Sequence, residues 1–162
     1  MRTPIFTFAS LLLISWAASA QSKSLRFEDY PVHERFLQKP TQPKLAEPRA
    51  RMFRTMLREN AARGINFAGH YVAATWGCGA DCLSFAIIDA YTGRVYFIPS
   101  LLNVGGFGYS PDEDRIQFRA NSRLLIVAGA PNDQGYVGRY YYLWKNNRLR
   151  LLRALEDRTY RG

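Results

Sequence analysis

The sequence has little of the chemistry that most metal and redox sites require. It contains two cysteines and two histidines among 162 residues. A structural zinc site needs four ligands, drawn mainly from these two residue types, so no metal centre is predicted. No Gly-Lys-Ser or Gly-Lys-Thr motif follows the glycine-rich residues 105–108, so a phosphate-binding loop is not indicated either. We therefore expect neither a metal nor an organic cofactor.

Long hydrophobic runs are also scarce. The one clear run extends from Ile5 to Trp16, with Arg2 before it and small residues at 18–20 after it. This three-part pattern is typical of a cleaved secretory signal peptide, residues 1–20. The run is shorter than the ~20 residues of a membrane-spanning helix, although an uncleaved N-terminal anchor is an alternative. No later segment is apolar enough to span, so we expect no integral membrane segment in the mature chain.

Acidic residues are outnumbered by basic ones. Cleavage after Ala20 would leave 142 residues and lower the net charge from +9 to +8, because Arg2 is the only charged residue removed. That length is typical of a single domain. Most of the positive charge is arginine, whose rigid fork of donors suits planar anions. The excess indicates an anionic envelope polymer or an acidic protein as partner, with nucleic acid not expected, whereas solubility alone is the alternative.

Prolines interrupt residues 21–47, which we interpret as an extended segment that wraps the rest of the chain. This segment carries apolar side chains that suit docking on the domain. They are Phe27, Tyr30, Val32 and Phe36. Residues 48–162 are then expected to form a single β-rich domain with a leading helix.

Residues 48–62 have the pattern of that helix. Pro48 suits its first position, and Gly64 lies where a left-handed C-cap is needed. Apolar side chains share one arc of the helix. They are Ala50, Met52, Phe53, Met56, Leu57 and Ala61. The opposite arc is a candidate anion-binding surface, with an ordinary solvated face or a membrane-surface helix as alternatives. It carries Arg51, Arg54 and Arg58.

Beyond residue 66 the apolar period changes from helix-like to strand-like. Turn signals separate about seven short strands, and residues 103–111 are expected to form a glycine-rich loop. The strands are expected at 67–76, 83–89, 94–98, 115–118, 123–128, 139–145 and 148–153. The pattern predicts a mainly β fold of the α+β type, an antiparallel meander sheet or sandwich with one N-terminal amphipathic helix.

The last predicted hairpin can be assigned a register. Asparagine tolerates positive φ, so the pair 146–147 suits a tight type I′ turn. Trp144 then pairs with Leu149, and Tyr142 pairs with Leu151, on one apolar face. The other face carries candidate binding residues. They are Arg139, Tyr141, Arg148 and Arg150. The polar face of a half-buried sheet is the alternative, and a one-residue slip would exchange the faces.

Cys78 and Cys82 follow the spacing C-x-x-x-C, whereas redox pairs follow C-x-x-C. In an oxidising compartment a disulfide between them is expected, with a redox pair or a metal site with His70 as alternatives. The ring would contribute roughly 2 kcal/mol and would fix a turn rather than hold the fold.

His70 is the weak candidate for a catalytic general base, because histidine titrates near neutral pH. We expect it inside the strand 67–76, on the face of Trp76, where a packed histidine is the ordinary alternative. Asp89 and Ser84 lie on the next strand but on opposite faces, so a hydrolase triad is poorly supported. His33 is a second histidine, which raises a weaker hypothesis of a nuclease acid–base pair.

Residues 66–71 (NFAGHY), 76–82 (WGCG…C) and 89–96 (DAYTGRVY) resemble a group of small uncharacterised exported bacterial proteins. That resemblance implies a bacterial envelope setting and no particular activity. Residues 109–112 with 123–127 resemble a hairpin of a TolB-like propeller blade. Blades take about 40 residues each and at least four are typical, so the resemblance implies a local hairpin and not a closed propeller.

The primary prediction is therefore an exported, non-catalytic binding or inhibitor-type protein for an anionic envelope ligand or an acidic partner protein. Export through a cleaved signal peptide would place it in the periplasm or outside the cell. A small exported hydrolase that uses His70 as general base is the alternative function.

Overall fold

The computed structural model describes residues 24–34, 38–106 and 114–161. Its main element is one open antiparallel sheet of eight strands, which confirms the mainly β fold predicted from the sequence. The strands are β1 Tyr71–Gly79, β2 Cys82–Asp89, β3 Val95–Tyr96, β4 Asn103–Gly105, β5 Ile116–Phe118, β6 Leu124–Pro131, β7 Tyr136–Lys145 and β8 Arg148–Arg161. The helices are the 3₁₀ turn η1 Phe27–Asp29, α1 Pro48–Met52 and α2 Arg54–Ala62. Within the described ranges, no helix has the length and apolar character needed to cross a membrane.

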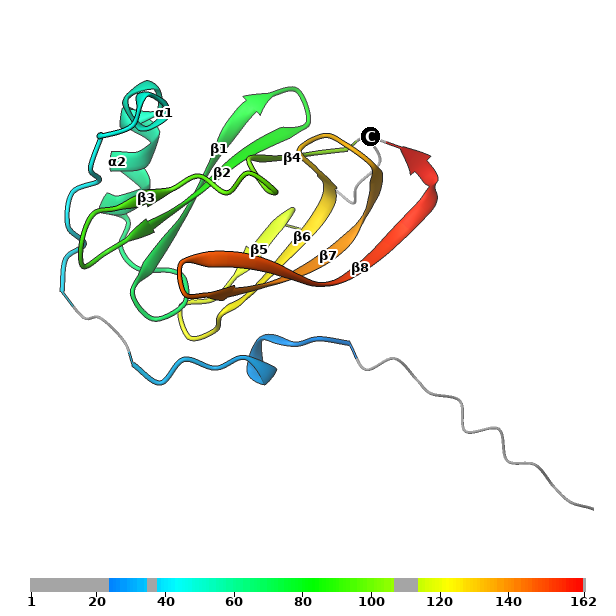
Figure 1. Cartoon of the computed structure of the whole chain (residues 1–162), viewed down its shortest axis with the longest axis horizontal. Coiled ribbons are helices and arrows are strands. Elements are labelled where there is room, and N and C mark those ends of the chain that lie inside the picture. Colours follow the sequence, from blue (N-terminus) through cyan, green and yellow to red (C-terminus); the bar gives the residue numbers. More distant parts are fainter. Residues whose placement is uncertain (1–23, 35–37, 107–113, 162) are drawn as a thin grey trace, which may run out of the picture.

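The strands run in the order β1-β2-β4-β6-β7-β8, with β3 paired to β2 and β5 paired to β6 (Figure 1). Strands β1 to β3 form one antiparallel meander, and β5 to β8 form another. Strand β4 joins the two meanders by pairing with β2 on one side and β6 on the other. It lies in the segment that the sequence analysis assigned to a loop, and it accounts for the eighth strand.

The main core lies between the inner faces of the two meanders, because the sheet curves around it (Figure 1). Trp144 of β7 is a fully buried member of this core. The indole makes tilted or edge-on ring contacts with Phe67, Tyr71 and Tyr96 at centroid distances of 6.4, 5.3 and 5.6 Å. Burial of so much aromatic surface is the main term that holds the first meander to the second.

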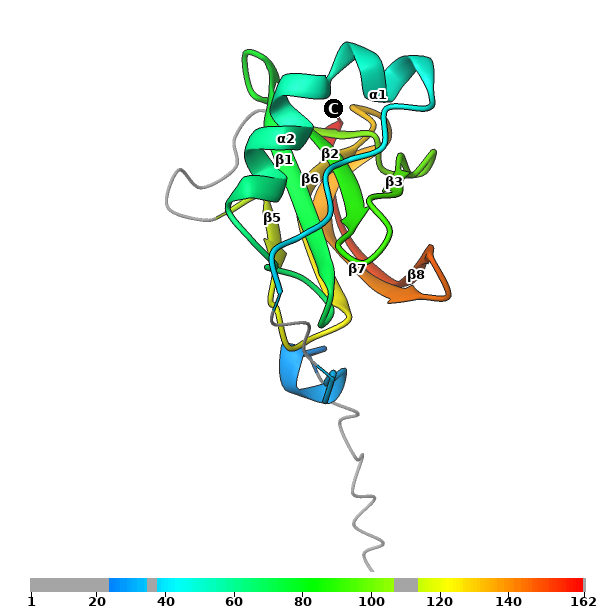
Figure 2. The same cartoon turned by 90° about the vertical axis from the view of Figure 1, so that its left-hand side faces the viewer.

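Helices α1 and α2 cover the outer face of the first meander (Figure 2). The predicted single helix is interrupted at Phe53, whose backbone leaves the helical region while its ring packs 5.0 Å from Trp76. Gly64 has φ +96°, as expected of a left-handed C-cap. Met52 was expected on the packed arc, but the interruption leaves its side chain 73% exposed.

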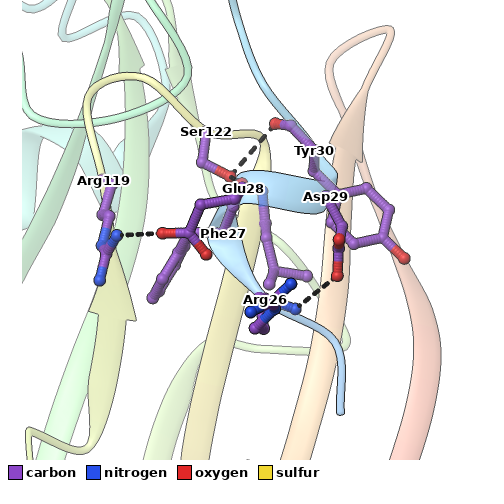
Figure 3. Close-up of polar contacts among 8 residues, drawn as sticks. Arg26, Phe27, Glu28, Asp29, Tyr30, Arg119 and Ser122 are labelled. Carbon is purple, nitrogen blue, oxygen red and sulfur yellow. Dashed lines mark hydrogen bonds and ion pairs between the residues drawn. The ribbon is translucent and has the colours of Figure 1, made fainter. Parts of the chain in front are cut away.

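The N-terminal segment covers the outer face of the second meander. Phe27 and Tyr30 pack on a small buried cluster, which confirms that this segment docks on the domain. The cluster comprises Leu124, Ile126 and Tyr141. The buried hydroxyl of Ser122 donates to the carbonyls of Phe27 and Tyr30 at 2.8 and 3.2 Å (Figure 3). Phe36 lies outside the described residues.

The outer edge of β1 is closed by other parts of the chain. The backbone of Tyr71 exchanges hydrogen bonds with Phe67. The side-chain amide of Asn66 donates to the carbonyl of Ala73 at 3.1 Å and accepts from its N–H at 2.7 Å. The amide of Asn60 from α2 bonds the backbone of Thr75 in the same way, at 3.3 and 3.4 Å. Two asparagine side chains therefore replace a neighbouring strand at this edge.

Candidate binding site at the tip of the last hairpin

The β7–β8 hairpin forms in the predicted register. Asn146 and Asn147 have φ values of +52° and +57°, which a type I′ turn requires at both positions. Trp144 pairs with Leu149, and Tyr142 pairs with residue 151, both as predicted. A bulge between Tyr141 and Tyr142 then shifts the pairing. The tip of the hairpin is thus a regular two-stranded ribbon, and its apolar and basic residues lie on the two faces that the predicted register assigns to them.

Three exposed cations lie on one face of this tip, and we call them the hairpin-tip cluster: Lys145, Arg148 and Arg150. Lys145 and Arg148 are direct cross-strand partners. Arg150 is the next residue of β8 on the same face and pairs with Leu143. Like charges directly opposite each other destabilise an antiparallel pair. No ion pair joins any of the three to a carboxylate in the described part of the chain.

Two hollows meet at this tip. One is lined by the hairpin-tip cluster together with Asn146 and Leu149. The other shares Lys145 and Asn146 and is also lined by Glu34, His70 and Arg123. The hydroxyl of Tyr71 donates to Oδ1 of Asn147 at 2.7 Å, so the turn is anchored to the first strand of the sheet. The tip therefore presents exposed cations on an anchored turn, beside a concave surface.

His70 lies in the turn before β1. The sequence analysis had expected it inside a strand, and that expectation is wrong. Ala68 and Gly69 adopt φ values of +45° and +85°, which fold residues 67–71 into a tight turn. The imidazole contacts the rings of Tyr71 and Tyr91 at 4.1 and 4.7 Å. Burial lowers the pKa of His70, while the nearby Asp89 and Glu34 carboxylates oppose that shift.

The residues of a hydrolase triad do not come together around His70. Asp89 pairs with Tyr71 at one end of β2, whereas Ser84 pairs with Trp76, five positions away. Five residues of extended strand span about 17 Å. The Asp89 carboxylate also accepts hydrogen bonds from the N–H groups of residues 91 and 92, at 2.8 and 3.2 Å, and so holds the β2–β3 turn.

The helix arginines form a separate group. Arg51, Arg54 and Arg58 are exposed on α1 and α2, which lie above the β7–β8 turn in the view of Figure 1. The Arg51 guanidinium already donates to the carbonyls of Leu45 and Ala46, at 3.3 and 2.6 Å. The two predicted sets of arginines therefore lie on different elements, one on the helices and one on the β7–β8 hairpin.

The remaining two candidates on the outer face of β7 differ from each other. Arg139 is exposed and pairs with Leu155 of β8. Tyr141 is 5% exposed, because the N-terminal segment packs over it. Tyr141 is thus a core residue of the second meander and is not part of an exposed face. The sequence analysis recognised that Phe27 could dock but had no means of locating the surface that receives it.

The Cys78–Cys82 disulfide is present, as predicted, and closes the turn between β1 and β2. Within this ring the carboxylate of Asp81 forms an ion pair with Arg115, just before β5. The ring is thereby tied to the second meander. Both partners are largely buried, so this contact is less screened by water than a surface ion pair.

Comparison with known proteins adds no identification. No protein-family model, curated protein or solved structure matches the chain. Within the described ranges there is also no cluster of three or more histidine, cysteine, aspartate or glutamate side chains that could hold a metal ion. The functional argument therefore rests on the hairpin tip, including Lys145, which the sequence analysis did not select as a binding residue.

Proposed function

We propose that this is an exported, non-catalytic binding protein that holds an anionic envelope polymer or an acidic partner protein on the hairpin-tip cluster. The observation that carries the proposal is the direct pairing of Lys145 with Arg148, with Arg150 on the same face and no ion pair from any of the three to a carboxylate among the described residues. Such a pairing costs free energy in the free protein, and a bound anion would offset that cost. Arginine also supplies two parallel donors to a carboxylate or phosphate.

Export is supported by the signal-peptide pattern of residues 1–20, which lie outside the described residues, and by the Cys78–Cys82 disulfide. Disulfides persist in oxidising compartments such as the periplasm. We expect the intact mass of the protein recovered from the periplasm or medium to correspond to cleavage after Ala20. A soluble product that retains Met1 to Ala20 would contradict the signal-peptide assignment.

The binding proposal is tested with two polyanions, polyphosphate and poly-L-glutamate, titrated into the mature protein over a range of salt concentrations. The tip variant is Lys145→Gln/Arg148→Gln/Arg150→Gln, and the control is Arg51→Gln/Arg54→Gln/Arg58→Gln, which removes the same number of charges. We expect the tip variant to bind at least about tenfold more weakly, a loss of ~1.4 kcal/mol, and the control to change little. Affinity should fall as salt screens the exposed cations.

Each result has a distinct meaning. Equal weakening in both variants would mean that net charge, and not the tip, attracts the polyanion. Weakening in the helix variant alone would move the site to Arg51, Arg54 and Arg58. His70→Gln should leave binding unchanged, whereas a hydrolase that uses His70 as general base would lose its turnover with this change.

A further inference from the structure

The two edges of the sheet differ in whether other parts of the chain cover them. The outer edge of β1 is closed by Phe67, Asn66 and Asn60. Strand β8 forms the other edge, extends over 14 residues, and pairs with β7 alone among the described strands. An uncovered edge strand of this length is a template for pairing with another chain, which most proteins block.

The backbone geometry shows which groups of β8 face outward. The N–H of Trp144 on β7 donates to the carbonyl of Arg123, on the side of β6, at 2.9 Å. Trp144 and its partner Leu149 therefore form a non-hydrogen-bonded pair, so the N–H and C=O of Leu149 point away from β7. The same alternation turns the backbone of Leu151 outward. In the described part of the chain, no turn, loop or cap forms a backbone hydrogen bond with Leu149 or Leu151.

Charge indicates what this edge would accept. Between residues 148 and 155, β8 carries arginine at 148, 150 and 153 and no acidic residue. Arg148 and Arg150 lie on the face that also carries Lys145. A strand with carboxylates at alternate positions would place them beside these cations, because alternate residues of a strand share a face. The cations disfavour a neighbouring strand that is itself basic.

We propose that β8 is the docking edge for an extended acidic segment of a partner protein, which adds a strand to the sheet. This inference rests on the proposed function and names the partner of the same site. Backbone hydrogen bonds to Leu149 and Leu151 supply a register, and the hairpin-tip cluster selects acidic side chains on one face. Leu151, which is 49% exposed, supplies an apolar contact on the opposite face.

The test uses an acetylated and amidated octapeptide of alternating glutamate and valine. Its control is the same peptide with every backbone nitrogen methylated, which keeps the charge but removes the donors and blocks strand pairing. We expect the unmethylated peptide to bind at least about tenfold more tightly by calorimetry. Amide hydrogen exchange at Leu149 and Leu151 should slow when this peptide binds. Exchange at Arg150, whose N–H already faces β7, should not change.

The outcomes separate the two proposals. Equal binding of both peptides without a change in exchange would overturn strand docking while leaving anion binding intact. Binding of polyphosphate without binding of either peptide would also overturn it. Failure of every polyanion and peptide to bind would instead remove the proposed function. Slow exchange at Leu149 and Leu151 in the free protein, together with a dimer in sedimentation, would assign the edge to a second copy of this chain.

Discussion

The first and last hairpins of this protein are both antiparallel two-stranded ribbons, but other parts of the chain cover the edge of the first and leave the edge of the last uncovered. The β1–β2 hairpin is closed by the Cys78–Cys82 disulfide, covered on its outer face by α1 and α2, and sealed along its edge by Asn60 and Asn66. The β7–β8 hairpin has a basic tip and an open edge. The difference shows that side chains and helices cover the edge and outer face of the first hairpin, whereas the edge of the last hairpin, on which we propose binding, stays uncovered in the described part of the chain.

Opening the sealed edge of β1 should have the largest effect on stability. Asn66→Ala would leave the N–H and C=O of Ala73 without partners, and Ala73 is 1% exposed. Each unsatisfied buried group costs ~1–3 kcal/mol, so we expect the free energy of unfolding in urea to fall by about 2 to 4 kcal/mol. Asn121→Ala, at an exposed position, is the control and should change it by less than about 0.5 kcal/mol. Equal effects would mean that the Asn66 amide does not seal the edge.

Removal of the disulfide should have a smaller effect. The ring between Cys78 and Cys82 is short, so the entropy that it removes from the unfolded chain is small. We expect Cys78→Ala with Cys82→Ala to lower the free energy of unfolding by about 1 to 3 kcal/mol without abolishing the fold. Thiol titration of the native exported protein should find no free thiol. Two reactive thiols would contradict the bond.

Acid should affect the region between the two hairpins, where His70 lies. Because burial lowers the pKa of His70 below its ordinary 6.5, the fold favours the neutral imidazole. Its contribution to stability is fully present above pH 6.5 and is lost as the pH falls from 6.5 towards the lower pKa of the folded state. His70→Gln should therefore flatten the pH dependence of unfolding in this window.

The smallest effect is expected on the open hairpin. Leu151 is 49% exposed on the edge strand, so Leu151→Ser removes about half of the apolar burial of a core leucine. We expect the thermal unfolding midpoint to fall by no more than a few degrees, corresponding to about 1 kcal/mol or less. A larger loss would show that the edge is covered in solution, and that the contrast between the two hairpins is smaller than the structure indicates.

Elements defined by local chemistry were predictable from the sequence. The pair 146–147 determined the turn, the register and both faces of the last hairpin, because two adjacent residues with positive φ permit few other geometries. Pro48 and Gly64 bounded the helical region correctly, because proline suits the first helical position and glycine suits a left-handed C-cap. The disulfide followed from spacing and the expected compartment.

Elements defined by distant contacts were not predictable. Strand β4 is three residues long and has no periodicity of its own, so its partners alone make it a strand. The apolar arc of residues 48–62 gave no sign of the interruption at Phe53, which accompanies packing against Trp76. Asn60 and Asn66 carry no signal in the sequence that distinguishes an edge-sealing amide from a solvated one. The burial of Tyr141 depends on residues more than 100 positions earlier in the chain.

That last contact has a consequence for how the molecule assembles. Ser122 holds the carbonyl of Phe27, 95 residues away, and the N-terminal segment covers a surface completed only by Tyr141. Synthesis proceeds from the N-terminus, so this segment emerges well before the surface on which it packs. Closing so long a loop carries an entropic cost before any contact rewards it, which slows folding. The second meander can therefore reach its final state only after the chain has been made at least as far as Tyr141.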